Sequence, residues 1–174
     1  GHPNPDQIYR ELAQNYERVG ELESAEAHFR TATSLDDSDW QNWNGLGALL
    51  AKLGRIEEAR TAFEAAVRLA PDCIYRPLEN VGTTYLYQAD FDKAIEIYEK
   101  IIAQAKVNRR FVAQAQLRRG QCLSKQGKKK EAEKAFRELV DQFKDSPDQK
   151  DLVAKAREFL PDDGPKLNLL PVPW

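Results

Sequence analysis

An internal repeat constrains the fold of this 174-residue chain more than any other feature of its sequence. Steps of 34, 35 and 38 residues link a small residue in each of four copies, and the same steps link three further rows of glycine, alanine or aromatic residues. The rows are Ala13, Gly47, Gly82 and Gly120; Gly20, Gly54, Ala89 and Gly127; Ala25, Ala59, Ala94 and Ala132; and Phe29, Phe63, Tyr98 and Phe136. A period of this length is typical of repeat architectures, in which each unit buries its apolar face against its neighbours. The sequence therefore predicts an array of four units.

The second unit shows most clearly that each copy consists of two helices. Apolar residues recur at helical spacing from Trp40 to Leu53, and a second helical pattern runs from Ile56 to Leu69. Gly54 between them can adopt the left-handed conformation that ends a helix, and Pro71 prevents the second helix from continuing. The corresponding turn residues in the other units are Gly20, Ala89 followed by Asp90, and Gly127. No segment has the alternation of a strand, so we predict an all-α fold.

Two glycines lie inside the first helix of the second unit, where each should cost about 1 kcal/mol relative to alanine. Gly47 belongs to the row of small residues, and we expect it to allow a close approach of the two helices beside Phe63. Gly45 lies on another face, where we expect no intramolecular contact to need a glycine. We therefore predict that Gly45 points into a ligand groove and leaves room there for the ligand.

The second unit resembles the tetratricopeptide repeat, whose pattern is W-x2-L-G followed by alanine, aromatic, alanine and proline residues. It matches the pattern at Trp43, Leu46, Gly47, Leu50, Gly54, Ala59, Phe63, Ala66 and Pro71. The fourth unit departs from it, with Gln116 and Arg119 where large apolar residues belong. The resemblance implies a right-handed α-solenoid whose inner wall is built from the first helix of each pair. It also implies a non-catalytic adaptor or scaffold that binds a peptide or a helix of a partner protein in the concave groove.

The predicted organisation has four parts. Residues 1–5 are interpreted as a tag remnant and disordered lead, and the repeats are expected at residues 6–39, 40–74, 75–110 and 111–145. A capping helix is predicted over residues 146–160, with Ser146 as its N-cap, because a solenoid needs a helix with one polar side to close its last face. Residues 161–174 form an apolar, proline-rich tail that we expect to dock on the protein's own surface beside the capping helix, with the groove of a neighbouring copy and a separate partner as alternatives.

Composition and residue pattern argue against catalysis and against several classes of partner. The formal charge of −2 gives no general attraction to nucleic acid, and no apolar run has the length of a membrane span. Cys73 and Cys122 are far apart, and His28 is the only histidine outside the lead, so no metal-ligand or nucleophile pattern is present. We predict no enzymatic activity, no cofactor and no metal site. The compartment stays undetermined, with the cytoplasm favoured over the periplasm.

Projection of the first helices predicts a peptide-binding groove that is net positive on a net negative chain. Its expected residues are Arg10, Gln14, Asn44, Gly45, Lys52, Arg76, Asn80, Thr83, Tyr87, Arg118, Gln121 and Lys125. Such a wall favours an acidic or carboxylate-ended peptide held by charge-assisted hydrogen bonds, and the two asparagine amides could pair with a peptide backbone.

Three alternatives remain open at this point. The same charged wall is compatible with an ordinary solvated surface. The chain could instead be a self-assembling scaffold that uses the solenoid ends and the tail, the latter giving a weak homo-oligomer. Finally, the repeats could be the recognition domain of a larger envelope-assembly or enzyme complex.

Overall fold

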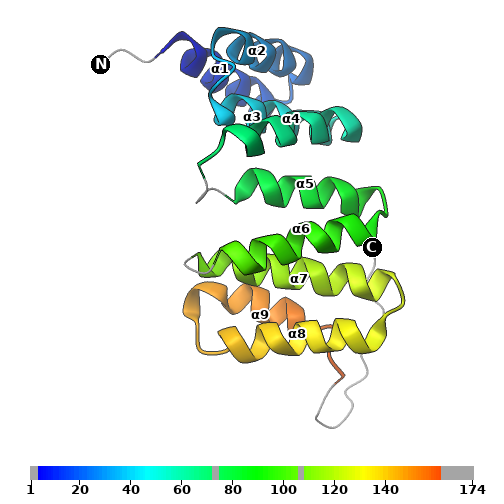
Figure 1. Ribbon diagram of the computed structural model, residues 1–174. Coiled ribbons are helices and arrows are strands. Elements are labelled where there is room, and N and C mark those ends of the chain that lie inside the picture. The colour runs from blue at the N-terminus through cyan, green and yellow to red at the C-terminus, as the bar shows by residue number, and fades with distance from the viewer. Residues whose placement is uncertain (1–3, 72–74, 106–107, 162–174) are drawn as a thin grey trace.

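The computed structural model describes residues 4–71, 75–105 and 108–161, which form nine α-helices, one short 3-10 helix and no strand. The elements are α1 (Pro5–Val19), α2 (Leu22–Leu35), α3 (Trp40–Lys52), α4 (Ile56–Leu69), α5 (Arg76–Tyr87), α6 (Phe91–Gln104), α7 (Arg109–Lys125), α8 (Lys129–Phe143), η1 (Pro147–Gln149) and α9 (Lys150–Arg157). Figure 1 shows the helix pairs stacked in chain order from α1 and α2 at one end to α7 and α8 at the other, with α9 beside α8. The predicted all-α solenoid is confirmed. The predicted docking of the tail concerns residues that, after Pro161, lie outside the described part of the chain.

The helices pack in two ways. Each helix contacts the next along the chain, so that α1 and α2, α3 and α4, α5 and α6, and α7 and α8 form four pairs. The first helices also contact one another in the order α1, α3, α5, α7 and α9. We call the row formed by α1, α3, α5 and α7 the first-helix wall. This is the surface on which the sequence places the candidate groove.

The turns within the four pairs have the conformation that the sequence predicts. Gly20, Gly54 and Gly127 have φ of +88°, +78° and +77°, and Ala89 takes the same place with a φ of +59°. Ala89 is the one described non-glycine residue with a positive φ, a conformation that costs an L-residue energy and that glycine adopts freely. The third unit therefore keeps the left-handed turn conformation although alanine replaces glycine there.

The two glycines of α3 both lie against phenylalanine rings. A Cβ on Gly47 would lie 2.7 Å from Cδ1 of Phe63, so the predicted close packing within the second unit is confirmed. A Cβ on Gly45 would lie 2.3 Å from Cε1 of Phe29, which belongs to α2 of the first unit. The expectation that no intramolecular contact needs Gly45 was therefore wrong. The contact crosses from one repeat to the next, and projection of a single unit cannot reveal it.

The end of the solenoid is closed by a shorter helix than the sequence predicts. Residues 147–149 form the 3-10 helix η1, α9 begins only at Lys150, and Ser146 makes no side-chain capping hydrogen bond. Leu152, Val153 and Ala156 are buried in the same apolar cluster as residues of α7 and α8. The element therefore packs against the last helix pair.

Candidate functional site

All twelve predicted groove residues lie on the first-helix wall, but they differ in what they contact. Those in α1 and α3 are Arg10, Gln14, Asn44, Gly45 and Lys52, and those in α5 and α7 are Arg76, Asn80, Thr83, Tyr87, Arg118, Gln121 and Lys125. The hydrogen bonds and ion pairs of each residue decide which of them remain available to a partner.

Arg10 connects the first two units instead of facing a ligand. Its guanidinium forms ion pairs with Asp39 and, at 3.9 Å, with Asp6, and its Nη1 donates to Oδ1 of Asn42 at 2.7 Å. Only 13% of the Arg10 side chain is exposed. Because its charge is neutralised by two carboxylates and its side chain is largely buried, Arg10 contributes little to the surface that a partner would contact.

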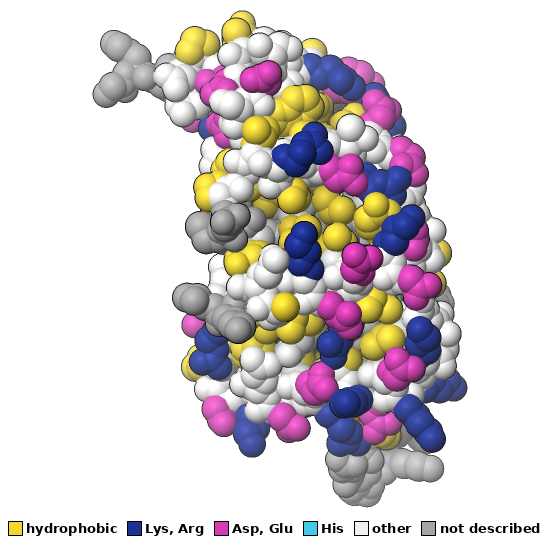
Figure 2. Space-filling view, in the orientation of Figure 1, with side chains coloured by type: hydrophobic (Ala, Val, Ile, Leu, Met, Phe, Trp, Pro, Cys, Tyr) yellow, Lys and Arg dark blue, Asp and Glu magenta, His cyan; other side chains and the backbone are white. Residues whose placement is uncertain are grey.

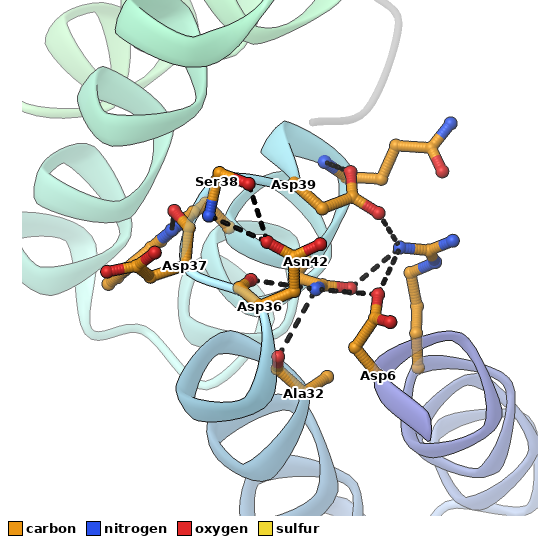
Figure 3. A network of polar contacts seen from close by, with 10 residues as sticks. Asp6, Ala32, Asp36, Asp37, Ser38, Asp39 and Asn42 are labelled. Carbon is orange, nitrogen blue, oxygen red and sulfur yellow. Dashed lines mark hydrogen bonds and ion pairs between the residues drawn. The ribbon is translucent and has the colours of Figure 1, made fainter. Parts of the chain in front are cut away.

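Asn42 is the centre of this polar network (Figure 3), and sequence reasoning missed it. Its side chain is fully buried, and its Nδ2 lies 3.2 Å from Oδ2 of Asp6 and from the carbonyl oxygens of Ala32 and Asp36. One side chain thus bridges α1, α2 and the loop before α3. The sequence contains one sign of this role. Asn42 is the polar member of a repeat row whose other members, Ile8, Pro77 and Ala115, are apolar.

Lys52, the other predicted groove cation of α1 and α3, is also paired with an acid of the same chain. Lys52 Nζ lies 3.3 Å from Oε1 of Glu17, with 52% and 28% of the two side chains exposed. Gln14 is exposed, and Gly45 is held by its contact with Phe29. Both predicted groove cations of the first two units are therefore paired with acids, whereas the exposed Arg18 of α1 donates to Oδ1 of Asn15 at 2.8 Å.

Between α3 and α5, two predicted residues meet. The Nδ2 of Asn80 donates to Oδ1 of Asn44 at 3.0 Å, and both side chains are half-buried. This bond orients the two amides and leaves the Asn44 amide hydrogens and the Asn80 carbonyl oxygen with capacity for further hydrogen bonds. A pair of this kind can bind a peptide backbone whatever its side chains.

Glu79 is a buried carboxylate between α5 and α7. Burial raises its pKa above the usual range, while the positive fields of Arg118 and Arg76 and a hydrogen bond from Gln114 act in the opposite direction. Burial is the larger effect, with 7% of Glu79 exposed. The cluster thus holds two guanidinium groups around one acid that resists ionisation.

The other α5 residues present both an aromatic and a polar surface. Tyr87 is 74% exposed, the largest exposed fraction among the exposed large hydrophobic side chains of the described residues. Thr83 donates to the carbonyl oxygen of Glu79 at 3.0 Å, and its hydroxyl lies 3.4 Å from that of Tyr98, whose pKa burial raises to about 12. The Arg76 guanidinium lies 5.9 Å from the ring centroid of Phe111.

The charge balance of the wall therefore changes along the solenoid. Arg10 and Lys52 are paired with acids, whereas Arg76, Arg118 and Lys125 form no salt bridge within the described residues. Figure 2 shows that charges of both signs and hydrophobic groups are interspersed on the face in view, so no broad field of one sign dominates it. Among the predicted groove residues, the cations without a salt bridge in the described part of the chain therefore lie on α5 and α7.

The remaining chemistry of the described residues is sparse. Burial raises the pKa of Cys122 to about 11, which keeps its thiol protonated and unreactive at neutral pH. His28 stacks on Tyr16 with ring centroids 5.1 Å apart. In the described ranges, no cluster of three or more histidine, cysteine or carboxylate side chains is arranged to bind a metal ion. None of the helices described there combines the length and apolar character needed to cross a bilayer.

Paired helices in a single stack, with a polar first-helix wall and small residues at the helix contacts, define a helical-repeat protein. The sequence model described as tetratricopeptide repeat matches residues 41–106 and 73–145, and a second model of the same description matches residues 7–39. The chain belongs to the tetratricopeptide repeat family. As a member of it, the chain is a protein–protein interaction module.

Comparisons with individual proteins agree with this assignment. The chain is 30% identical over 94 residues to the BBSome complex member BBS4 of Mus musculus, a match that spans 53% of this chain and 18% of that protein. The crystal structure of MamA superposes with a TM-score of 0.72 at 23% identity, covering 84% of this chain and 82% of that one. The structure of YrrB, described as a tetratricopeptide repeat protein with an unusual peptide-binding site, gives 0.62 at 21% identity over 89% and 86%. At these identities, the two structures support the fold.

Proposed function

We propose that the chain is an adaptor that binds an acidic segment of a partner protein on the α5–α7 part of the first-helix wall. The observation that carries the proposal is the contrast between the two halves of this wall. Among the predicted groove cations, Arg10 and Lys52 on α1 and α3 are paired with acids of the same chain, whereas Arg76, Arg118 and Lys125 form no salt bridge within the described residues. An acidic segment would supply the carboxylates that these three side chains lack, through charge-assisted hydrogen bonds.

Two further features support a peptide or a helix as the bound element. The Asn44–Asn80 pair offers amide groups to a backbone, next to the positively charged section. Tyr87, largely exposed, provides an aromatic surface of the kind that dominates binding energy at protein interfaces. YrrB, which shares the fold, is described as having a peptide-binding site, and BBS4 is described as a member of a complex. Both descriptions are consistent with a role in complex assembly.

The proposal is tested by reversing charges on the wall and, as a matched control, on the second helices. The wall variant is Arg76→Glu/Arg118→Glu. The control variant is Arg68→Glu/Lys100→Glu, which changes the net charge by the same amount at exposed positions of α4 and α6. Proteins captured from native lysate by the wild type should also be captured by the control variant and lost by the wall variant. Binding of an identified partner peptide should weaken as ionic strength rises. Equal capture by the two variants would place binding elsewhere.

A further inference from the structure

The outer face of α1, at the N-terminal end of the solenoid, carries an exposed apolar stripe. Ile8, Leu12 and Val19 are 43%, 38% and 69% exposed. At about 100° per residue, these three side chains and that of Asn15 share one side of the helix. We call this set the α1 stripe.

The repeat register shows that this stripe is an uncovered packing surface. Leu46 and Val81, which follow Leu12 by one and two periods, are only 3% and 4% exposed. Leu49, one period after Asn15, is fully buried. In the later units the second helix of the preceding pair packs on the first helix, as α2 does on α3 and α4 on α5. Within the described residues, no helix precedes α1 to cover the stripe in the same way.

The opposite end of the solenoid does not offer a matching surface among the described residues. The exposed residues of α9 and the turn after it are mainly charged: Lys150, Asp151, Lys155, Arg157 and Glu158. Phe159 is 45% exposed, but its ring stacks on that of Phe136 with centroids 4.6 Å apart. Head-to-tail joining of copies would therefore cover an apolar stripe with a charged helix.

We propose that the α1 stripe pairs with the α1 stripe of a second copy, in an antiparallel arrangement about a two-fold axis. The argument is self-complementarity. Glu11 and Arg18 are exposed, lie on the same flank of the stripe and are separated by two turns, about 10 Å. In an antiparallel pair centred between them, Glu11 of each copy lies beside Arg18 of the other. The same symmetry brings Ile8 close to Val19 of the second copy.

Asn15 fits this arrangement as a residue that limits its strength. Its Oδ1 accepts a hydrogen bond from Nη2 of Arg18 at 2.8 Å, so it links the stripe to the charged flank. A polar residue inside an apolar helix contact lowers affinity while favouring one register. The dimer is accordingly weak, and Asn15→Leu, which introduces the residue type found one period later at Leu49, tightens it. The interface closes on itself and joins two copies, not an open chain.

The test is charge reversal followed by restoration, read by sedimentation velocity over a concentration series at low ionic strength. The wild type should show a monomer–dimer equilibrium. Glu11→Arg and Arg18→Glu should each raise the dimer dissociation constant about tenfold, because each creates two like-charge contacts in place of two opposite ones. The double variant Glu11→Arg/Arg18→Glu should return to within about threefold of the wild type. Glu96→Arg, a reversal at an exposed position of α6, should have no effect.

Each alternative gives a different result, provided that circular dichroism shows all variants to be equally helical. A wild type that stays monomeric to about millimolar concentration would overturn the proposal. So would a double variant as weak as the single ones, or a dimer unchanged by Leu12→Arg. Loss of the dimer on removing residues 162–174 would assign the contact to the tail instead. Arg76→Glu/Arg118→Glu should leave the dimer intact, which separates this interface from the proposed peptide site.

Discussion

Replacing Gly45 by alanine tests how strongly the second unit packs against the first. In an exposed helix the substitution should stabilise the protein by about 1 kcal/mol, because alanine has the higher helix propensity. Here the new Cβ would lie 2.3 Å from Cε1 of Phe29, a separation that real Cβ atoms essentially never show. Phe29 is 1% exposed, so its ring has little room to move away.

The expected magnitude follows from two opposing effects. Inserting a methyl group into a closely packed contact costs about 1 to 3 kcal/mol, and the propensity gain of about 1 kcal/mol offsets part of this. Because the separation is so short, we expect a net destabilisation of about 1 to 2 kcal/mol. For a chain of this size, each kcal/mol lowers the melting temperature by about 2 to 4 °C, which predicts a decrease of about 2 to 8 °C.

The assay is thermal unfolding followed by circular dichroism at 222 nm, with two controls. Ala48→Gly, at an exposed position of the same helix, measures the propensity effect alone and should cost about 0.5 to 1 kcal/mol. In the background of Phe29→Leu, the penalty of Gly45→Ala should largely disappear, because the smaller side chain leaves room for the methyl group. A Gly45→Ala variant that is more stable than the wild type would refute the packing argument. It would restore the interpretation of Gly45 as an open groove position.

Three further predictions follow from the buried polar groups. Asn42→Leu should destabilise the protein by about 3 kcal/mol in urea unfolding, because it leaves the Asp6 carboxylate and two carbonyl groups without their amide donor. Glu79→Gln should stabilise the protein at pH 7 in the same assay. Burial raises the pKa of Glu79 in the folded state. Its contribution to the free energy of unfolding therefore falls as the pH rises from the ordinary glutamate pKa to the raised pKa, and it stays low at higher pH. The gain should vanish at acidic pH, and a constant gain would exclude titration as its cause. In a Cys73→Ser background, Cys122 should react with a thiol reagent at pH 8 only after unfolding, because burial raises its pKa to about 11.

The helix pairs could be predicted from the sequence because the signals that define them are local and repeat four times. The turn at Gly54 and the contact of Gly47 with Phe63 lie within one unit, where the helical spacing and the short turn together relate the residues. The start of the last helix, α9, at Lys150 instead of residue 146 was harder to predict. Ser146 and Pro147 precede and begin the 3-10 helix η1, and the Ser146 hydroxyl accepts a hydrogen bond from Arg109 instead of capping a helix.

Contacts between units could be predicted much less well from the sequence. Gly45 meets Phe29, and Arg10 meets Asn42, which is 32 positions away in the sequence. Both contacts depend on the angle and offset at which one helix pair packs on the next, and the sequence of a single unit contains no direct measure of either. The list of groove residues was therefore right about the helices that carry the wall, but it could not show which side chains are already bound within the protein.

Some residues of the first-helix wall are engaged by the unit that follows them. In each of the first three units, a wall residue is engaged by the unit that follows: Arg10 by Asn42, Asn44 by Asn80, and Glu79 by Gln114. In the described residues, η1 and the short helix α9 follow the fourth unit, and Oδ2 of Asp151 in α9 lies 3.9 Å from Nη2 of Arg110 near the start of α7.

No carboxylate of α9 forms a salt bridge with Arg118 or Lys125 within the described residues. Their charge is thus not neutralised by the described part of the chain. The substitution Gln121→Glu would place a carboxylate of the protein itself beside Arg118, whose Nη1 lies 3.4 Å from Oε1 of Gln121. It should weaken partner binding without lowering the melting temperature. A variant that binds as well as the wild type would show that the charge of α7 is not what the partner recognises.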